Sequence, residues 1–281
     1  MASTSAMLMS FPSTRTGFLS LCRQALRFIV PVDCLACGVS LQGDPVPGFC
    51  QRCWDLILPL QGPCCVLCSQ PFVSPAAVSY SPDHCCQDCL EHRPAFTRAW
   101  TLYPYLPPLR EAICAFKYRG KIGLAKPLAQ LMIDALPSNL DVDLILPVPL
   151  HPSRLRSREF NQSLLLSDHL ARHLDLPVSI HELVRVQATD PQTTLPRTMR
   201  LKNVRHAFSV CRPRVVAGRR ILLIDDVFTT GATLHECAAA LSASGAKSVI
   251  ALTLARTIGP LFIPDRRFVE EPVRSSPILG L

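Results

Sequence analysis

The sequence predicts an α/β fold built on a parallel sheet, preceded by a smaller cysteine-rich module. The first observation is an apolar run, Ile221–Ile224, followed by Asp225 and Asp226, a loop of small and hydroxyl residues, and an apolar helical pattern up to Ser244. A short apolar run of this kind is typical of a parallel strand that is buried on both faces. The second observation is that eight of the 14 cysteines form four Cys-x-x-Cys pairs. A length of 281 residues gives room for one α/β core and one small module.

The N-terminal segment is predicted to lie outside both units. Residues 1–16 are rich in Ser and Thr and are predicted to be disordered. Residues 17–33 carry apolar side chains at helical spacing and are predicted to form an amphipathic helix. This helix has no acid before Asp33, as in transit peptides, but we interpret it as packing on the module that follows. Arg23 and Arg27 interrupt the apolar stretch, so it does not resemble a secretory signal. No run of about 20 apolar residues predicts a membrane span, and we expect a cytoplasmic protein.

Residues 34–92 are predicted to bind two structural zinc ions, because two Cys-x-x-Cys turns together can surround one ion. The expected ligand sets are Cys34, Cys37, Cys50 and Cys53 for one ion, and Cys65, Cys68, Cys86 and Cys89 for the other. Disulfides are the alternative and need an oxidising compartment. A crossed pairing also stays open. The doublets Cys64-Cys65 and Cys85-Cys86 leave open which cysteine of each doublet binds the ion. His84 and His92 are possible spare ligands.

Residues 95–258 are predicted to form the α/β domain, and residues 259–281 a loose, Pro-rich tail. The expected strands, besides the one at Ile221–Ile224, are Trp100–Tyr105, Leu144–Pro147 and Ser248–Ala255. The expected helices are Leu109–Tyr118, Gly123–Leu136 and a helix that runs from its cap at Asn161 to Leu174. The segment Thr189–Ala207 lacks clean periodicity and is predicted to be a loop over the site.

The loop after Asp226 is predicted to bind a sugar phosphate. It consists of Thr229, Thr230, Gly231, Ala232 and Thr233. Unpaired N–H groups and the positive end of the dipole suit a phosphate at a helix N-terminus, and Gly231 permits a close approach. The two carboxylates would repel a phosphate, so we expect them to face ribose hydroxyls or Mg²⁺. We also expect them to lack a local cation, since Arg219 and Arg220 lie at the other end of the strand.

Two plainer interpretations compete with the sugar-phosphate site: a generic strand–loop–helix turn, and an acidic pair of purely structural use. The sequence has neither Gly-x-Gly-x-x-Gly after a strand nor Gly-Lys-Ser/Thr, which excludes a dinucleotide fingerprint and a Walker loop.

The positive charge of the chain is concentrated in one segment. His151–Arg220 contains 13 Lys and Arg against 5 acids, which equals the net charge of +8 for the whole chain. This distribution indicates a polyanionic ligand near the phosphate loop. The alternative is that many of these arginines are solvated on helix faces.

Several motifs together resemble the ComF family, which joins an N-terminal double zinc ribbon to a type I phosphoribosyltransferase domain. The segment from Ile221 to Thr233 resembles the loop of such enzymes that binds phosphoribosyl pyrophosphate (PRPP). Further matching motifs are Phe116–Gly120, Asp143–Leu150, the Arg-rich segment Arg154–Gln162, and Gln192, Leu195, Arg197, Arg200, Asn203, Val204 and Phe208. One departure is Glu159, which stands where the family usually has Gly and where a carboxylate would repel pyrophosphate.

The resemblance implies a PRPP-binding protein that transfers phosphoribosyl to an unknown nitrogen acceptor and releases pyrophosphate. It implies that Asp225 and Asp226 hold the ribose hydroxyls, that the loop holds the 5-phosphate, and that Lys117 and Arg158 offset the pyrophosphate charge together with Mg²⁺. The alternative is a non-catalytic or PRPP-sensing competence factor that handles incoming single-stranded DNA. Single-stranded DNA and proteins of the competence machinery are then the expected partners.

Overall fold

A computed structural model describes residues 32–74, 76–79, 81, 83–138, 140–187 and 204–259. The predictions for residues 1–16, for most of the 17–33 helix, for the centre of the Thr189–Ala207 loop and for the tail after residue 259 lie outside these residues.

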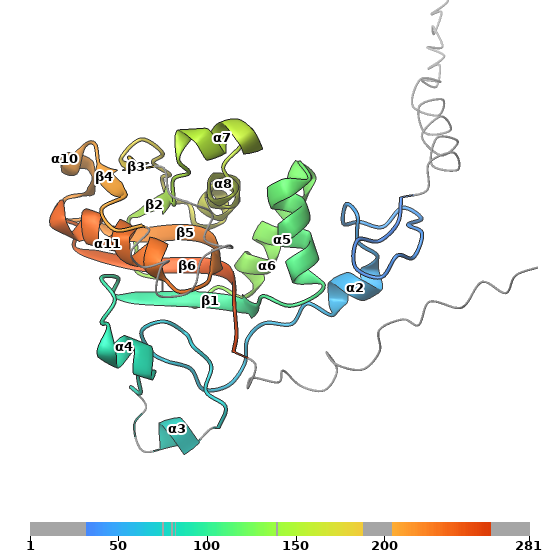
Figure 1. Cartoon of the computed structure of the whole chain (residues 1–281), viewed down its shortest axis with the longest axis horizontal. Helices are drawn as coiled ribbons and strands as arrows, with labels where there is room; N and C mark the ends of the chain where they lie inside the picture. Colours follow the sequence, from blue (N-terminus) through green and yellow to red (C-terminus); the bar gives the residue numbers. More distant parts are fainter. Residues whose placement is uncertain are drawn as a thin grey trace, which may run out of the picture.

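A four-stranded, all-parallel sheet forms the centre of the structure (Figure 1). Its strand order is β1-β6-β5-β2. The strands are β1 (Arg98–Pro104), β6 (Ser248–Arg256), β5 (Arg220–Phe228) and β2 (Leu144–Pro147). The two central strands, β5 and β6, are paired along nearly their whole length, from Arg220 opposite Ser248 to Phe228 opposite Arg256.

Helices cover both faces of this sheet. One face carries α5 (Leu109–Tyr118), η1 (Ile122–Leu124), α6 (Ala125–Asp134) and α8 (Gln162–Leu174), and the other carries α11 (Ala232–Ala243). Alternate residues of β5 point to opposite faces, as the period of a strand requires. Leu222 and Ile224 belong to the core with α5, α6 and α8, whereas Ile221 and Leu223 belong to the core with α11. Burial on both faces explains the unbroken apolar run in the sequence.

Most predicted elements are confirmed, with differences at their ends. β2 and α5 have the predicted bounds, and Asn161 caps α8 by accepting a hydrogen bond from the Ser163 N–H at 3.0 Å. β5 is longer than the apolar run Ile221–Ile224 that predicted it, because the strand continues through both acids to Phe228. The Arg-rich segment forms a short helix, α7 (Pro152–Arg158). A small antiparallel pair, β3 (Leu183–Arg185) with β4 (Phe208–Val210), and the short helix α10 (Pro213–Val216) were not predicted.

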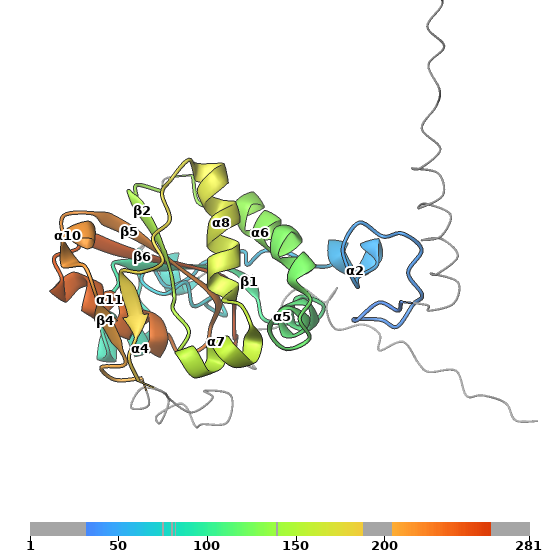
Figure 2. The same ribbon diagram turned by 90° about the horizontal axis from the view of Figure 1, so that it is seen from above.

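The two halves of the cysteine-rich module lie apart, and each packs on a different part of the α/β domain. The first half contains α2 (Gln51–Asp55) and shares the core of α5 and α6 through Cys34, Phe49 and Cys53. The second half contains α3 (Ala76–Ser79) and α4 (Gln87–Glu91) and lies beside β1, where the Ala99 N–H donates to the Leu67 carbonyl at 2.7 Å. Figures 1 and 2 show α2 beyond α5 and α4 on the other side of the domain. In the described part of the chain, no helix is long and apolar enough to cross a membrane.

Candidate functional site

A cleft of about 850 Å³ opens at the carboxyl ends of β2 and β5. Its walls come from the end of α5, from α7 and the start of α8, and from the turn between β5 and α11. The carboxyl edge of an open parallel sheet is the usual place for a ligand, because loops from several strands converge there. The fold therefore brings the predicted loop and acids to one cavity.

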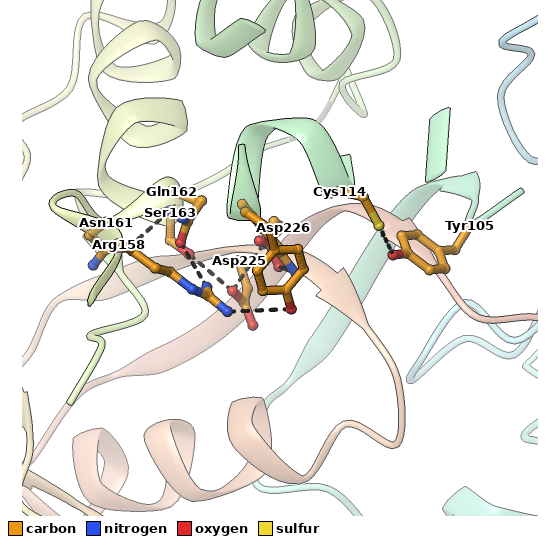
Figure 3. A network of polar contacts seen from close by, with 10 residues as sticks. Tyr105, Cys114, Arg158, Asn161, Gln162, Ser163, Asp225 and Asp226 are labelled. Carbon is orange, nitrogen blue, oxygen red and sulfur yellow. Dashed lines mark hydrogen bonds and ion pairs between the residues drawn. The ribbon is translucent and has the colours of Figure 1, made fainter. Parts of the chain in front are cut away.

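The two predicted acids line this cleft but have different partners. The Asp226 carboxylate forms an ion pair with Lys117, with 2.8 Å between Oδ1 and Nζ. Asp225 Oδ1 accepts hydrogen bonds from the Ser163 hydroxyl and from the Asp226 N–H, each at 3.0 Å (Figure 3). The expectation that the pair has no cation is therefore wrong, because α5 brings Lys117 across the face of the sheet. No motif pointed to Ser163, which lies 62 positions before Asp225.

Asp225 is the acid with the more unusual electrostatic environment. Burial, followed by the charge of Asp226, raises the pKa of Asp225 to about 7. The charge of Lys117, the Asp226 N–H and the Ser163 hydroxyl act in the opposite direction but do not outweigh burial. A carboxyl group with a pKa near neutrality in a cleft is typical of a functional site.

The loop between β5 and α11 has the geometry of an anion site. Gly231 is the N-cap of α11 with φ +78°, a left-handed conformation that favours glycine, and no side chain caps the helix. Thr229, Gly231 and Thr233 line the cleft. Thr230 is not among the lining residues, and its hydroxyl accepts a hydrogen bond from the Ala232 N–H at 3.4 Å. The positive end of α11 therefore faces the same cavity as the two acids.

Basic and aromatic side chains also line the cleft. The Arg158 guanidinium lies 5.0 Å from the ring centre of Tyr118 and donates to Gln162 Oε1 at 3.1 Å, an arrangement that fixes its direction. Arg154 also lines the cleft. Arg185 on β3 lines it as well, is 7% exposed, and lies over the Phe208 ring at 5.3 Å. In the sequence, Arg185 is only one of the basic residues of the segment His151–Arg220. Its place in the cleft was not predicted, because no local pattern shows that β3 reaches the cleft.

Glu159 also lines the cleft, and the structure gives a physical reason for the Gly that the ComF resemblance implies at this position. Glu159 is the C-cap of α7 with φ +65°, and its N–H donates to the Leu155 carbonyl at 2.8 Å. A left-handed residue after a helix is usually Gly, because a Cβ is unfavourable there. A Gly at this position would therefore serve to end α7. The Glu159 residue that stands there is exposed.

The structure brings the eight cysteines of the four pairs together in two groups of four. The groups are Cys34, Cys37, Cys50 and Cys53, and Cys65, Cys68, Cys86 and Cys89, with all sulfurs of a group within 4.8 Å of one another. Two of the S···S distances are 3.8 Å, between Cys37 and Cys50, and 3.6 Å, between Cys68 and Cys86. Four sulfurs at about 2.3 Å from a tetrahedral zinc ion would be about 3.8 Å apart. The described cysteines form no disulfide. Cys64, Cys85, His84 and His92 belong to neither group.

Burial and crowding of the thiols shift their pKa values in both directions, raising those of Cys53 and Cys68 and lowering those of Cys34 and Cys65. Hydrogen bonds from Cys68, Cys86 and Cys89 hold the pKa of Cys65 well below its usual range. In the first group, burial raises the pKa of Cys34, but backbone N–H groups, led by that of Cys50, lower it to about 7. Thiolates are the metal-binding form of cysteine.

Comparison with known proteins identifies the family. The family model described as "Phosphoribosyl transferase domain" matches residues 161–269. The DNA utilization protein YhgH of Escherichia coli is 34% identical over 230 residues, which cover 76% of this chain and 99% of that protein. Competence protein F of Haemophilus influenzae is 31% identical, with 74% and 90% covered. The chain belongs to the ComF family. ComFC of Bacillus subtilis, another similar protein, is 29% identical, with 80% and 95% covered.

The ComF motifs lie far apart in the chain but meet in the cleft. Lys117, Arg158 and Gln162 come from three different helices and line the cavity together with the acids of β5. Val204 and Phe208, from the segment before β5, are buried. The ComF positions from Gln192 to Asn203 lie outside the described residues.

Proposed function

We propose that this chain binds PRPP with Mg²⁺ in the cleft and transfers its phosphoribosyl group to a nitrogen acceptor. The observation that carries the proposal is the meeting of an acidic pair, a helix N-terminus and several cations in one cavity. A phosphate, two ribose hydroxyls and a pyrophosphate group need these three kinds of partner.

Each part of the cleft would then act on a different part of the substrate. The backbone of Thr229–Thr233 would hold the 5-phosphate, and Asp225 and Asp226 would accept hydrogen bonds from the ribose hydroxyls. In the reaction the bond between C1 of the ribose and pyrophosphate breaks, the leaving oxygen keeps the electron pair, and the acceptor nitrogen bonds to C1 and loses its proton. The carboxylates would stabilise the positive charge that develops on the sugar.

The leaving group requires cations, and the cleft offers them. Arg158 is held by Tyr118 and Gln162, so it is oriented before the substrate binds. Lys117 is paired with Asp226, and it would turn to pyrophosphate when Asp226 accepts a ribose hydroxyl. Mg²⁺, when bound, would neutralise further charge on the pyrophosphate.

Calorimetric titration with PRPP and Mg²⁺ tests binding, and pyrophosphate release with a panel of bases and amines tests transfer. We expect Asp225→Asn/Asp226→Asn to bind PRPP at least about a hundredfold more weakly, since each lost charge-assisted hydrogen bond is worth about 1.5–3 kcal/mol. The matched control is Asp134→Asn/Asp168→Asn, which removes the same charge from helices α6 and α8 outside the cleft. Equal affinity of the two double variants would refute the assigned role of the acids.

A second candidate function is a PRPP-responsive protein that handles single-stranded DNA without turnover. The favouring observation is that α7 carries Arg154, Arg156 and Arg158, and that Arg158 lies over the ring of Tyr118, a cleft residue that is 61% exposed. Arginines beside an exposed ring suit a strand with stacked bases. Each contacting arginine that is neutralised should reduce the slope of log K against log salt by about 0.7. Pyrophosphate release without salt-dependent DNA binding would favour the enzyme instead.

We further propose that the two cysteine groups bind structural zinc, which the thiolate chemistry and spacing of their sulfurs fit. The cytoplasmic location predicted above suits this proposal, because a reducing compartment keeps thiols available. Elemental analysis should give about two zinc ions per chain. Protein without metal that keeps its full ellipticity and stability would contradict this.

A further inference from the structure

Arg256, the last residue of β6, lies between the second cysteine group and the cleft. It is 4% exposed. Its Nη1 donates to the Cys68 carbonyl at 2.5 Å, and its Nη2 donates to Gln70 Oε1 at 2.6 Å. The other side of the guanidinium lies over the Phe228 ring, 4.7 Å from its centre. One side chain thus contacts both the cysteine module and the last residue of β5.

Within the described residues, the charge of Arg256 has no carboxylate partner. Among the described residues, no acid lies within 4.0 Å of its guanidinium, and its Nε has no hydrogen-bond partner. A buried cation without a countercharge is strongly disfavoured. Cys68 Sγ lies 4.0 Å from Nη1. Four thiolates around one Zn²⁺ carry a net charge of −2, so a loaded cysteine group would supply the countercharge that no described carboxylate supplies.

The Phe228 ring connects Arg256 to the phosphate loop. Phe228 and Arg256 are paired residues of adjacent strands, and the Thr257 N–H donates to the Phe228 carbonyl at 3.0 Å. The ring also lies directly against Gly231, where an added Cβ would come within 2.6 Å of the ring. The position of the ring therefore helps to set the position of Gly231, the residue at which α11 begins.

We infer that Arg256 is a positioning residue that couples the second cysteine group to the phosphate loop. A loaded metal site holds the guanidinium, the guanidinium holds the Phe228 ring, and the ring holds the loop in its anion-binding shape. The effect on PRPP affinity rests on the proposed function, whereas the effect on the loop itself does not. The first cysteine group belongs to the core on the other face of the sheet and has no such connection to Phe228.

The test compares Arg256→Met with Arg52→Met, its matched control. Arg52 is exposed on α2 and directly precedes Cys53 of the first group. Three quantities are measured on the zinc-loaded full chain: PRPP affinity, hydrogen exchange of the 229–233 amides, and zinc release to a colorimetric chelator. For Arg256→Met we expect about tenfold weaker PRPP binding, faster exchange of the loop, and faster release of one of the two zinc ions. Arg52→Met should change none of these.

A second variant, Phe228→Leu, separates coupling from simple loss of structure. It should weaken PRPP binding and loosen the loop as Arg256→Met does, but leave zinc release unchanged, and the two effects on PRPP affinity should not add in the double variant. If Arg256→Met does not fold, the test rests on Phe228→Leu. Hydrogen exchange of the 229–233 amides at the wild-type rate in that variant then overturns the inference. Faster zinc release in Arg256→Met with unchanged loop exchange also overturns it. If the wild-type chain does not bind PRPP, the proposed function fails, while exchange and zinc release still test the coupling.

Discussion

The substitution Asp225→Asn should make the stability of the protein less dependent on pH. Asp225 lies on β5 beside Ser163 and Asp226 at the wall of the cleft, and its pKa is raised to about 7 by burial and then by the Asp226 charge. A carboxyl group whose pKa is higher in the folded than in the unfolded state binds its proton more tightly in the folded state. The free energy of unfolding therefore decreases as the pH rises from about 4 to about 7, and this contribution is constant above that window.

The size of the effect follows from the two pKa values. Between the ordinary value of 3.8 and the value of about 7 lie roughly three pKa units, which correspond to about 4 kcal/mol when Asp225 is fully ionised. Asparagine has nearly the same shape and still offers an oxygen to the Ser163 hydroxyl, but it carries no charge. We therefore expect Asp225→Asn to be more stable than the wild type at pH 8, by as much as about 4 kcal/mol, and to differ little from it at pH 4.5.

Urea unfolding at pH 4.5, 6 and 8, without PRPP, measures this difference. The control is Asp134→Asn, which removes an exposed carboxylate of α6 and should leave the pH dependence of the wild type unchanged. Two results would refute a raised pKa at Asp225. One is a variant that is less stable than the wild type at pH 8. The other is a free energy of unfolding that differs from the wild type by the same amount at all three pH values.

Three further substitutions test the cleft. Asp226→Asn should destabilise the protein by about 1–3 kcal/mol in urea unfolding, because it leaves the largely buried Lys117 ammonium without its carboxylate, and adding Lys117→Met should recover most of that loss. Glu159→Gly should raise the thermal stability by about 0.5–1 kcal/mol, since the position has φ +65°, and should also strengthen PRPP binding by removing a negative charge from the cleft. Gly231→Ala should weaken PRPP binding at least about tenfold in calorimetry, because the new Cβ would meet the Phe228 ring at 2.6 Å and because φ is +78°; unchanged binding would contradict the tight contact.

The sequence determined the features that depend on local pattern. The run Ile221–Ile224 predicted a strand buried on both faces, because only such a strand lacks polar positions. The spacing Cys-x-x-Cys predicted the four pairs, since each turn places two sulfurs side by side, and the structure joins these pairs in sequential order into two groups of four. Asn161 was recognisable as a cap because capping depends on the residue itself and its next neighbours.

Only the tertiary structure decided which distant residues meet. Lys117 reaches Asp226, and Ser163 reaches Asp225, because α5 and α8 pack on the sheet near the end of β5. The same packing raises the pKa of Asp225, since burial is a property of the folded chain. Arg256 ends an ordinary apolar strand in the sequence, and its place between Cys68 and Phe228 follows only from how the second cysteine group lies beside the sheet. Local patterns specify elements and turns, whereas contacts across 62 and 188 positions depend on the packing of the whole core.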